Sequence, residues 1–192
     1  VAFSPDLSIV SMEKEIAEIC GGATKVFADI GAEVTDEIPD FTGVLEAFQT
    51  LRAVLFATMM EPIMQQHGDK IAPEIVGNIE RGLNITPPQI FEAERIRIEL
   101  FKKILDFFET HDFLICPAAS IAPFPVDQRY VTEIDGKPCE TYIDWFSITF
   151  ALTMTACPTI SVPCGFTTEG LPVGIQIMGK PRGEAALLLV AK

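Results

Sequence analysis

The side chains that could act as nucleophiles in this 192-residue chain are its serines and its five cysteines. Such a nucleophile needs a base within hydrogen-bonding reach and an oxyanion site, often formed by backbone N–H groups of a glycine-rich turn. No serine lies in a Gly-x-Ser-x-Gly elbow, and His67 and His111 both lie near predicted helix ends, where a histidine complements the helix dipole. Cys164, beside Gly165 at a predicted strand end, is the best thiol candidate. Two interpretations stay open for it: a buried structural thiol, which we favour because no cation is near in sequence, or the nucleophile of a cysteine hydrolase.

Metal, phosphate and carboxylate chemistry have still less support in the sequence. There is no Cys-x-x-Cys pair, and the two histidines lie far apart, so ligands for zinc are lacking. Residues 165–170 match neither a P-loop nor a dinucleotide-binding fingerprint. Acidic pairs at residues 36–37 and 92–94 are typical of turns and helix surfaces. We therefore predict no catalytic residue, no metal ligand and no cofactor-binding residue within the chain itself.

The elements that would position a site follow from hydrophobic periodicity, and the first part of the chain (residues 1–111) is mainly helical. A short strand is predicted at residues 1–4 and another at 32–35, with helices over residues 11–31, 44–64, 73–83 and 86–110. Ser11 is the expected N-cap of the first helix and Gly31 its stop, and Met59 is expected to fill the core. The apolar stripes of the two long helices are expected to be Leu45, Phe48, Leu51, Leu55 and Met59, and Ile90, Phe91, Ile98, Phe101, Leu105 and Phe108.

The second part (residues 112–192) is predicted to be rich in strands. A buried strand at residues 113–116 precedes a proline-containing loop over 117–139, which at that length is expected to be functional or packed against a partner. Residues 142–155 indicate a helix or buried segment around Trp145, and residues 159–165 and 171–179 a hairpin that turns at Glu169-Gly170. Gln176 in this hairpin would need hydrogen-bond partners if buried, and Gly183 opens a last helix.

Composition excludes several classes of protein. The net charge of −13 leaves no surplus of cations for binding nucleic acid or an anionic membrane, and no apolar run reaches the roughly 18–20 residues that a membrane span needs. Hydrophobic residues make up 48% of the chain, so it is not disordered. An odd number of scattered cysteines favours the reducing cytoplasm. Because the chain begins at Val1 and stops within an amphipathic pattern, we expect it to be a piece of a longer protein.

Three stretches, in order along the chain, resemble the amidase signature family. The run CPTISVPCGFTTEGLPVGIQIMG at residues 157–179 is similar to the family's C-terminal hallmark. Residues 112–117 with 122–126 resemble a second late landmark, and residues 1–7 with 30–34 resemble the segment that follows the catalytic core. The resemblance implies hydrolysis of an amide without metal or organic cofactor, by a serine, a second serine joined through a cis peptide, and a lysine. In that family these groups lie in the N-terminal half, so the resemblance places them outside this chain.

The resemblance also suggests residues that line the acyl pocket, in the run that precedes the hallmark. Thr149 matches a threonine of the family, and Thr153 stands where asparagine is usual. Trp145 is either an anchor of the hydrophobic core, which is the interpretation that its residue type favours, or part of the pocket lining. We take Trp145, Thr149 and Thr153 as the candidate substrate-binding residues. Phe146 stands where the glutamine-using subunit of the tRNA amidotransferase has aspartate, which favours a general amidase.

The sequence thus predicts the C-terminal part of an amidase-signature domain over residues 1–192: an α/β fold with a mixed sheet flanked by helices. Its expected partners are a small amide substrate and the N-terminal half of the same protein, with no nucleic acid and no membrane. We expect the strands at 113–116 and 159–164 to lack sheet neighbours in this chain alone, and a homo-oligomer to form through the exposed apolar face. The alternatives are a non-catalytic relative that binds a ligand or partner, and the amidotransferase subunit.

Overall fold

The computed structural model describes all residues from Val1 to Lys192. The chain forms two compact units. The sheet unit consists of Val1–Phe41 and Leu100–Lys192, and the helical unit consists of Thr42–Glu99.

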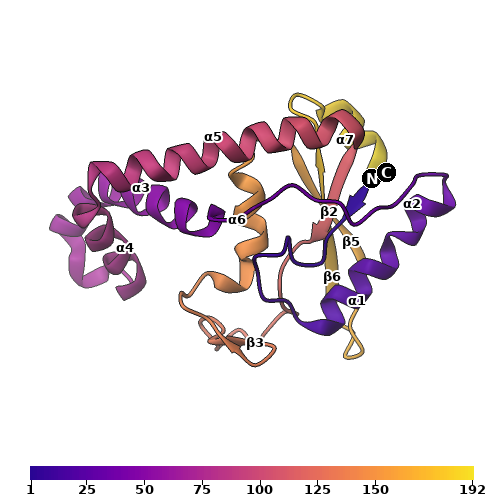
Figure 1. The fold of residues 1–192 in the computed structure, drawn as a ribbon. Helices are drawn as coiled ribbons and strands as arrows, with labels where there is room; N and C mark the ends of the chain where they lie inside the picture. The colour runs from indigo at the N-terminus through magenta and orange to yellow at the C-terminus, as the bar shows by residue number, and fades with distance from the viewer. The chain divides into compact units, whose positions relative to one another are not determined.

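The sheet unit is built on a four-stranded mixed sheet (Figure 1). Its strands lie in the order β1 (Ala2–Phe3), β2 (Phe113–Pro117), β6 (Pro172–Gly179) and β5 (Thr159–Phe166). β1 pairs with β2 in parallel, and the other two pairings are antiparallel. The predicted α/β class and mixed sheet are confirmed. The expectation that residues 113–116 lack sheet neighbours is wrong, because β1 and β6 pair with β2 on its two sides. The other strand of that expectation, at residues 159–164, belongs to β5 and does lie at an edge of the sheet.

The hairpin β5–β6 forms where the sequence predicts it. At the turn, the Thr167 N–H donates to the Leu171 carbonyl at 2.8 Å, and Gly170 has φ +79°, a backbone conformation that glycine adopts without strain. Pro163 pairs with Gly174 and Gly165 with Val173, so Cys164 lies in a β-bulge with no partner of its own. Gln176 is buried and its Nε2 donates to the Pro117 carbonyl at 3.0 Å, which is the partner that burial of this side chain requires.

The first predicted helix is two helices, α1 (Lys14–Ala23) and α2 (Lys25–Asp29). Thr24 separates them, since its Oγ1 donates to the Gly21 carbonyl at 2.7 Å and its N–H turns back to the same carbonyl. Ser11 as N-cap is wrong, because Glu13 occupies that position. Gly31, with φ +95°, does end the second helix. The strand predicted at residues 32–35 is also wrong: a single bridge joins Ala2 and Thr35.

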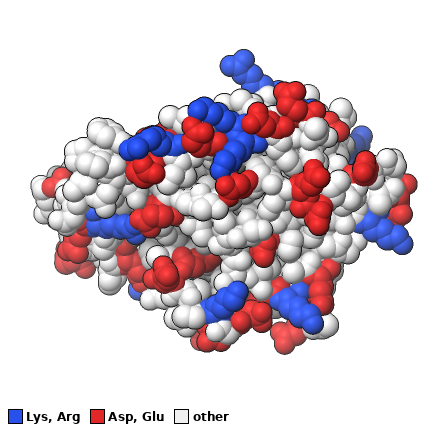
Figure 2. All heavy atoms as spheres, viewed as in Figure 1, with Lys and Arg blue, Asp and Glu red and all other residues white.

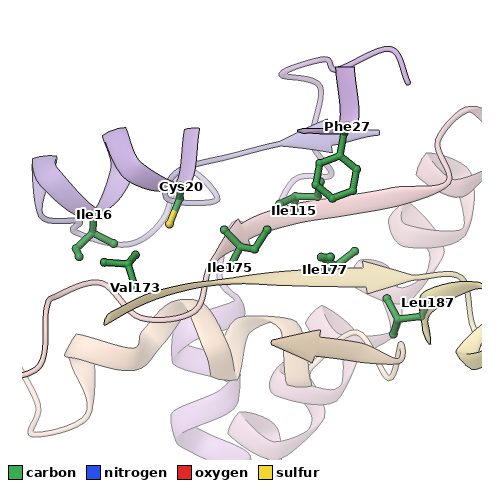
Figure 3. Packing of buried hydrophobic residues seen from close by; sticks show 8 residues of the cluster. All are labelled: Ile16, Cys20, Phe27, Ile115, Val173, Ile175, Ile177 and Leu187. Carbon is green, nitrogen blue, oxygen red and sulfur yellow. The ribbon is translucent and has the colours of Figure 1, made fainter. Parts of the chain in front are cut away.

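One hydrophobic cluster of the sheet unit packs α1 and α2 against the sheet (Figure 3). Its buried members come from five elements: Ile16, Cys20, Phe27, Ile115, Val173, Ile175, Ile177 and Leu187. Leu187 belongs to α7 (Glu184–Val190), which begins after Gly183 as predicted. The core therefore joins segments from both ends of the chain.

Between β2 and β5 the chain makes a long connection with little regular structure. It contains the two-residue strands β3 (Glu133–Ile134) and β4 (Lys137–Pro138), the 3₁₀ helix η2 (Asp144–Phe146) and the helix α6 (Ser147–Thr153). η2 and α6 fall within the predicted segment around Trp145. The small hairpin β3–β4 turns at Asp135-Gly136, both with positive φ. An Asp-Gly pair is a known signal for this turn, which the sequence prediction missed.

The helical unit contains α3 (Val44–His67), η1 (Gly68–Lys70), α4 (Pro73–Asn84) and the first half of α5 (Pro87–Thr110). The extents of these helices agree with the prediction, but their apolar stripes do not. On α3 the buried residues are Val44, Ala47, Gln49, Thr50 and Ala53. Leu55 and Met59 are 54% and 62% exposed, so Met59 as core filler is wrong.

Most of the stripe predicted for α5 is also misplaced, although Phe108 is buried as predicted. The buried apolar residues of this helix are Ala93, Leu100, Ile104 and Phe108. Four residues of the predicted stripe are exposed: Phe91, Ile98, Phe101 and Leu105. α5 thus carries an exposed apolar stripe beside its buried face, and periodicity alone did not distinguish the two.

Charged side chains of both signs mix over the surface. On the face shown in Figure 2, the Lys and Arg side chains lie among Asp and Glu, in keeping with the net charge of −13. Exposed ion pairs such as Lys103 Nζ with Asp40 Oδ2, 2.7 Å apart, belong to this mixture. None of the helices is both long and apolar enough to cross a membrane.

Candidate functional site: an apolar pocket beside the hairpin

A pocket of about 490 Å³ opens in the sheet unit, between α1, the loop after β2, η2 and the hairpin. Its lining consists almost wholly of small apolar, proline and aromatic residues: Ile16, Ala118, Ala119, Ile121, Ala122, Pro123, Phe124, Trp145, Ser161, Pro172, Val173 and Gly174. Pockets that bind small molecules are of this size and character, with few polar groups. We take this pocket as the candidate site.

Backbone hydrogen bonds hold the loop after β2 against the pocket. The Ala118 N–H donates to the Gly174 carbonyl at 2.8 Å, which extends the sheet pairing by one residue. Ser120 then bridges two elements, since its N–H donates to the Trp145 carbonyl at 3.0 Å and its carbonyl accepts from the Glu13 N–H at 2.9 Å. The polar backbone of an irregular loop is thereby satisfied, as a half-buried loop requires.

Glu13 ties the start of α1 to the same loop. Its Oε2 accepts a hydrogen bond from the Ala122 N–H at 2.8 Å, while its backbone N–H contacts Ser120. Because Ile16 lies one helical turn further on and lines the pocket, these two bonds fix the position of one wall. Sequence reasoning missed Glu13, whose partners lie more than one hundred residues away.

Trp145, the one tryptophan of the chain, lines the pocket and is half-buried. Its ring stands edge-on to that of Phe124, with centroids 5.4 Å apart and an interplanar angle of 86°. The Phe146 ring is also edge-on to the indole, with centroids 4.8 Å apart. Edge-to-face aromatic pairs of this geometry are favourable beyond their buried area, so the indole is held in place as part of the wall.

Asp144 positions Trp145 by organising the turn before it. Its Oδ2 accepts from the N–H groups of Glu140 and Thr141 at 2.7 and 2.9 Å, and the Thr141 hydroxyl donates to its Oδ1. The sequence carried a signal for this arrangement, because Thr-x-x-Asp at residues 141–144 is a capping-box pattern. The sequence prediction did not include it.

The other two predicted substrate-binding residues lie elsewhere. The Thr149 hydroxyl donates to the Ala118 carbonyl at 2.8 Å, so Thr149 supports a lining residue from behind without lining the pocket itself. Thr153 is exposed, and its hydroxyl donates to the Thr149 carbonyl of its own helix at 3.2 Å. Of the three residues, the structure brings Trp145 to the pocket.

The pocket has one side-chain hydroxyl, Ser161, and no ionisable side chain in its lining. Gly174 on the opposite strand leaves the space beside this hydroxyl open, because a Cβ there would come within 3.2 Å of the Val162 carbonyl and 3.5 Å of Ser161 Oγ. The lining can therefore hold an apolar group and offer one hydrogen bond to a polar atom of the same ligand. It contains no base that could activate a nucleophile.

The residues considered as nucleophile or base are held by other groups. Cys164 Sγ lies 3.8 Å from Cys20 Sγ, and burial raises the pKa of the Cys164 thiol. His111 is buried, stacks on Phe107 and lies within hydrogen-bonding distance of two hydroxyls, at Thr35 and Thr110. Neither arrangement resembles a nucleophile paired with a base. No three metal-ligating side chains come together in the structure.

Comparison with known proteins decides the family. A family model described as Amidase matches residues 1–188. The chain belongs to the amidase family. The resemblance found in the three sequence landmarks is thereby confirmed.

Several relatives and solved structures agree with this assignment. This amidase-family chain is 29% identical to an acylamidase of Rhodococcus erythropolis, over 100% of this chain and 40% of that protein. It is 24% identical to a glutamyl-tRNA(Gln) amidotransferase subunit of Alkaliphilus metalliredigens, over 88% of this chain and 34% of that protein. The chain thus spans about two fifths or less of the length of these relatives.

Two solved structures share the fold. One is a bacterial aryl acylamidase of the amidase signature family, with a TM-score of 0.82 and 22% identity over 95% of this chain and 40% of that one. The other is 6-aminohexanoate cyclic dimer hydrolase, with a TM-score of 0.81 and 20% identity over 99% of this chain and 43% of that one. At this level of identity the likeness establishes the fold.

Proposed function

We propose that this chain is the C-terminal part of an amidase that hydrolyses a carboxylic amide to the acid and ammonia or an amine. The observation that carries the proposal is the match of the Amidase family model to residues 1–188. The reacting serines and lysine that the family uses would lie in preceding polypeptide. The part described here would supply the sheet and one apolar wall of the substrate site, with no catalytic residue and no cofactor.

The lining of the pocket supports an apolar substituent on the substrate. Trp145 and Phe124 offer aromatic surface, and no charged group faces the space. An aryl or alkyl group would be bound by removal of its surface from water, at roughly 25 cal/mol per Å². The relative named acylamidase and the structure named aryl acylamidase are consistent with such a group.

The second candidate is the amidase subunit of a glutamine-dependent tRNA amidotransferase. It is favoured by relatives of that name, one of which, from Thermodesulfovibrio yellowstonii, is 37% identical over 52% of this chain and 19% of that protein. Glutamine carries an ammonium and a carboxylate, and burying either group without a partner is costly. Since Phe146 and the uncharged lining offer no such partner, we favour the general amidase.

The experiment is an assay of the full-length protein, including the polypeptide that precedes Val1, on three classes of amide. An aryl anilide, an aliphatic amide and glutamine would each be followed by release of amine or ammonia. We expect the anilide to be hydrolysed best. Hydrolysis of glutamine alone would favour the amidotransferase subunit, and no hydrolysis of any amide would favour a non-catalytic relative that binds a ligand or partner.

A pocket variant tests whether the described wall contacts the substrate. Trp145→Ala removes aromatic surface worth about 1–2 kcal/mol, which corresponds to a rise of about 5- to 30-fold in KM for the anilide. Thr153→Ala is the matched control, because Thr153 is exposed and lies outside the lining. An equal effect of the two substitutions on KM would contradict the assignment of the pocket.

Cytoplasmic localisation and the proposed partners belong to the same proposal. None of the five cysteines is in a disulfide, which supports a reducing compartment. The exposed apolar stripe of α5 supports contact with the N-terminal half of the protein, or with a second copy when that half is absent.

A further inference from the structure

Two cysteines far apart in the sequence meet where α1 packs on the edge strand of the sheet. Cys20 lies on the face of α1 that is turned toward the sheet, with its sulfur directed at the core (Figure 3). Cys164 lies on β5, and the two Sγ atoms are 3.8 Å apart. A disulfide needs an S–S distance of about 2.05 Å, so the sulfurs must approach by roughly 1.8 Å. Rotations of the two side chains supply movements of this size.

The backbone at Cys164 is suited to such an adjustment. Because Cys164 lies in the bulge between Pro163 and Gly165, it has no paired residue on β6. A bulged residue can therefore change its orientation without breaking a regular pairing. Gly165 beside it lets the helix lie close, since a Cβ at that position would come within 2.9 Å of the Ile19 side chain.

We propose that Cys20 and Cys164 form a reversible disulfide when the protein meets a peroxide. Neither cysteine lines the pocket, so the pair is a modification site outside the candidate substrate site. A two-thiol set lacks the four ligands that a structural zinc site takes, and no third metal-ligating side chain joins it. Oxidation is therefore the chemistry that suits this pair.

The reaction balances with hydrogen peroxide as the oxidant. The Cys164 thiolate attacks one peroxide oxygen, the O–O bond breaks, and hydroxide leaves to give a sulfenic acid. The Cys20 sulfur then displaces that oxygen, which leaves as water, and the S–S bond forms. Two thiols and one peroxide thus give one disulfide and two waters, with two electrons passing from sulfur to oxygen.

The surroundings assign the two roles. Cys20 is fully buried, and both burial and the neighbouring Cys164 raise the pKa of its thiol. Cys164 is partly exposed, so peroxide can reach it; burial raises its pKa too, but the hydrogen bond with Cys20 lowers it in part. Cys164 is thus the attacking thiol and Cys20 the resolving one. Because thiolate is scarce at neutral pH, the rate should rise by about tenfold per pH unit across the range from pH 7 to 8.

Disulfide formation would fix one wall of the pocket. Cys20 lies one turn after Ile16, and its Sγ lies 3.7 Å from the carbonyl of Gly174. Both Ile16 and Gly174 line the pocket. A bond from Cys20 to β5 therefore ties the helix to the same hairpin that forms the opposite side of the pocket.

The test is a thiol count and a peptide map of the protein before and after peroxide. The described residues contribute five thiols to the reduced protein, and the peptide map follows these five. We expect three after oxidation, a single linked peptide that joins Cys20 to Cys164, and five again after dithiothreitol. Cys164→Ser and Cys20→Ala should each keep all four remaining thiols, whereas Cys157→Ser, the matched control, should still lose two. Cys20→Ala retains an apolar side chain in the core, so its folding can be checked by circular dichroism.

Two results would overturn the proposal. One is an unchanged count of five thiols after peroxide has oxidised an exposed reference dithiol in the same tube. The other is a linked peptide that contains neither Cys20 nor Cys164, or that joins either of them to Cys116, the fully buried thiol of β2.

Discussion

Gly82 on α4 allows α3 and α4 to lie close together, and replacing it tests that packing. A Cβ at Gly82 would lie 2.1 Å from the Ala53 carbonyl oxygen and 2.7 Å from the Ala57 Cβ. Contacts shorter than 3.0 Å are not tolerated, so the helices would have to separate by about 0.9 Å or more. The obstacle is backbone, which cannot rotate away as a side chain would. Gly82→Ala is therefore a case of overpacking, which costs typically 1–3 kcal/mol.

The helix propensity of alanine opposes this cost. Alanine is favoured over glycine inside a helix by about 1 kcal/mol. With an overpacking cost at the upper end of its range, we expect Gly82→Ala to lower the free energy of unfolding by about 2 kcal/mol. Gly77→Ala on the same helix is the matched control, because nothing lies within 4 Å of a Cβ there. It should raise the free energy of unfolding by up to about 1 kcal/mol.

The assay is urea unfolding followed by far-UV circular dichroism, which reports on the helix content of the whole chain. The propensity gain is common to both variants, so their difference, about 3 kcal/mol, measures the steric cost alone. Ala57→Gly combined with Gly82→Ala should not restore stability, because the Ala53 carbonyl remains in the way. If Gly82→Ala is as stable as Gly77→Ala, the close approach of α3 and α4 is wrong.

Three further predictions concern the sheet unit and α5. Burial raises the pKa of the Cys116 thiol, so the unfolded chain loses that proton at a lower pH than the folded chain does. The free energy of unfolding should therefore fall above about pH 9, by up to 1.4 kcal/mol per pH unit. Denaturation curves at several pH values should show a smaller slope for Cys116→Ala. Ser120 Oγ is buried without a hydrogen-bond partner, so Ser120→Ala should leave the free energy of unfolding unchanged or raise it by about 1 kcal/mol. Ser147→Ala removes a hydrogen bond to the Asp144 carbonyl and should lower the free energy of unfolding by about 1 kcal/mol, as thermal denaturation would measure. The exposed stripe of α5 should make the chain self-associate, and a variant with Ile98→Lys and Leu105→Lys should sediment as a smaller species; a monomeric parent chain would contradict this.

The sequence predicted the fold best where local signals were strong. The hairpin β5–β6 has two runs of strand residues with a glycine turn between them, and the extents of the three helices predicted between residues 44 and 110 agree because prolines and glycines mark their ends. The break at Thr24 was missed, because a side-chain bond to the Gly21 carbonyl competes with the helix there. The pairing of β1 with β2 was also out of reach, since more than one hundred residues separate the two strands.

The buried faces of the long helices could not be predicted by hydrophobicity. Helix α3 buries Ala47 and Ala53, and Gly82 of α4 comes within contact of this surface. Small residues let two helices approach closely, so the packed face is the one with little side chain, while Leu55 and Met59 remain outside. A rule that assigns the most apolar stripe to the core therefore fails when the interface is built from backbone proximity. On α5, too, the most apolar stripe is exposed. It forms a surface that another part of the protein can cover, as we propose above.

The candidate site was predictable in part. Which of its residues could be predicted depends on how its wall is built. Trp145 was identified because its segment precedes the family hallmark, whereas Thr153 was drawn from the same run and is exposed. The wall is completed by Ile16 on α1, which Glu13, the N-cap of that helix, holds in place through hydrogen bonds to residues more than one hundred positions away. Position along the chain therefore indicates which segment forms the site, but the pairing of distant segments decides which side chains enter it. Residues of α1 should therefore be tested for contact with the substrate, although no motif near the C-terminus identifies them.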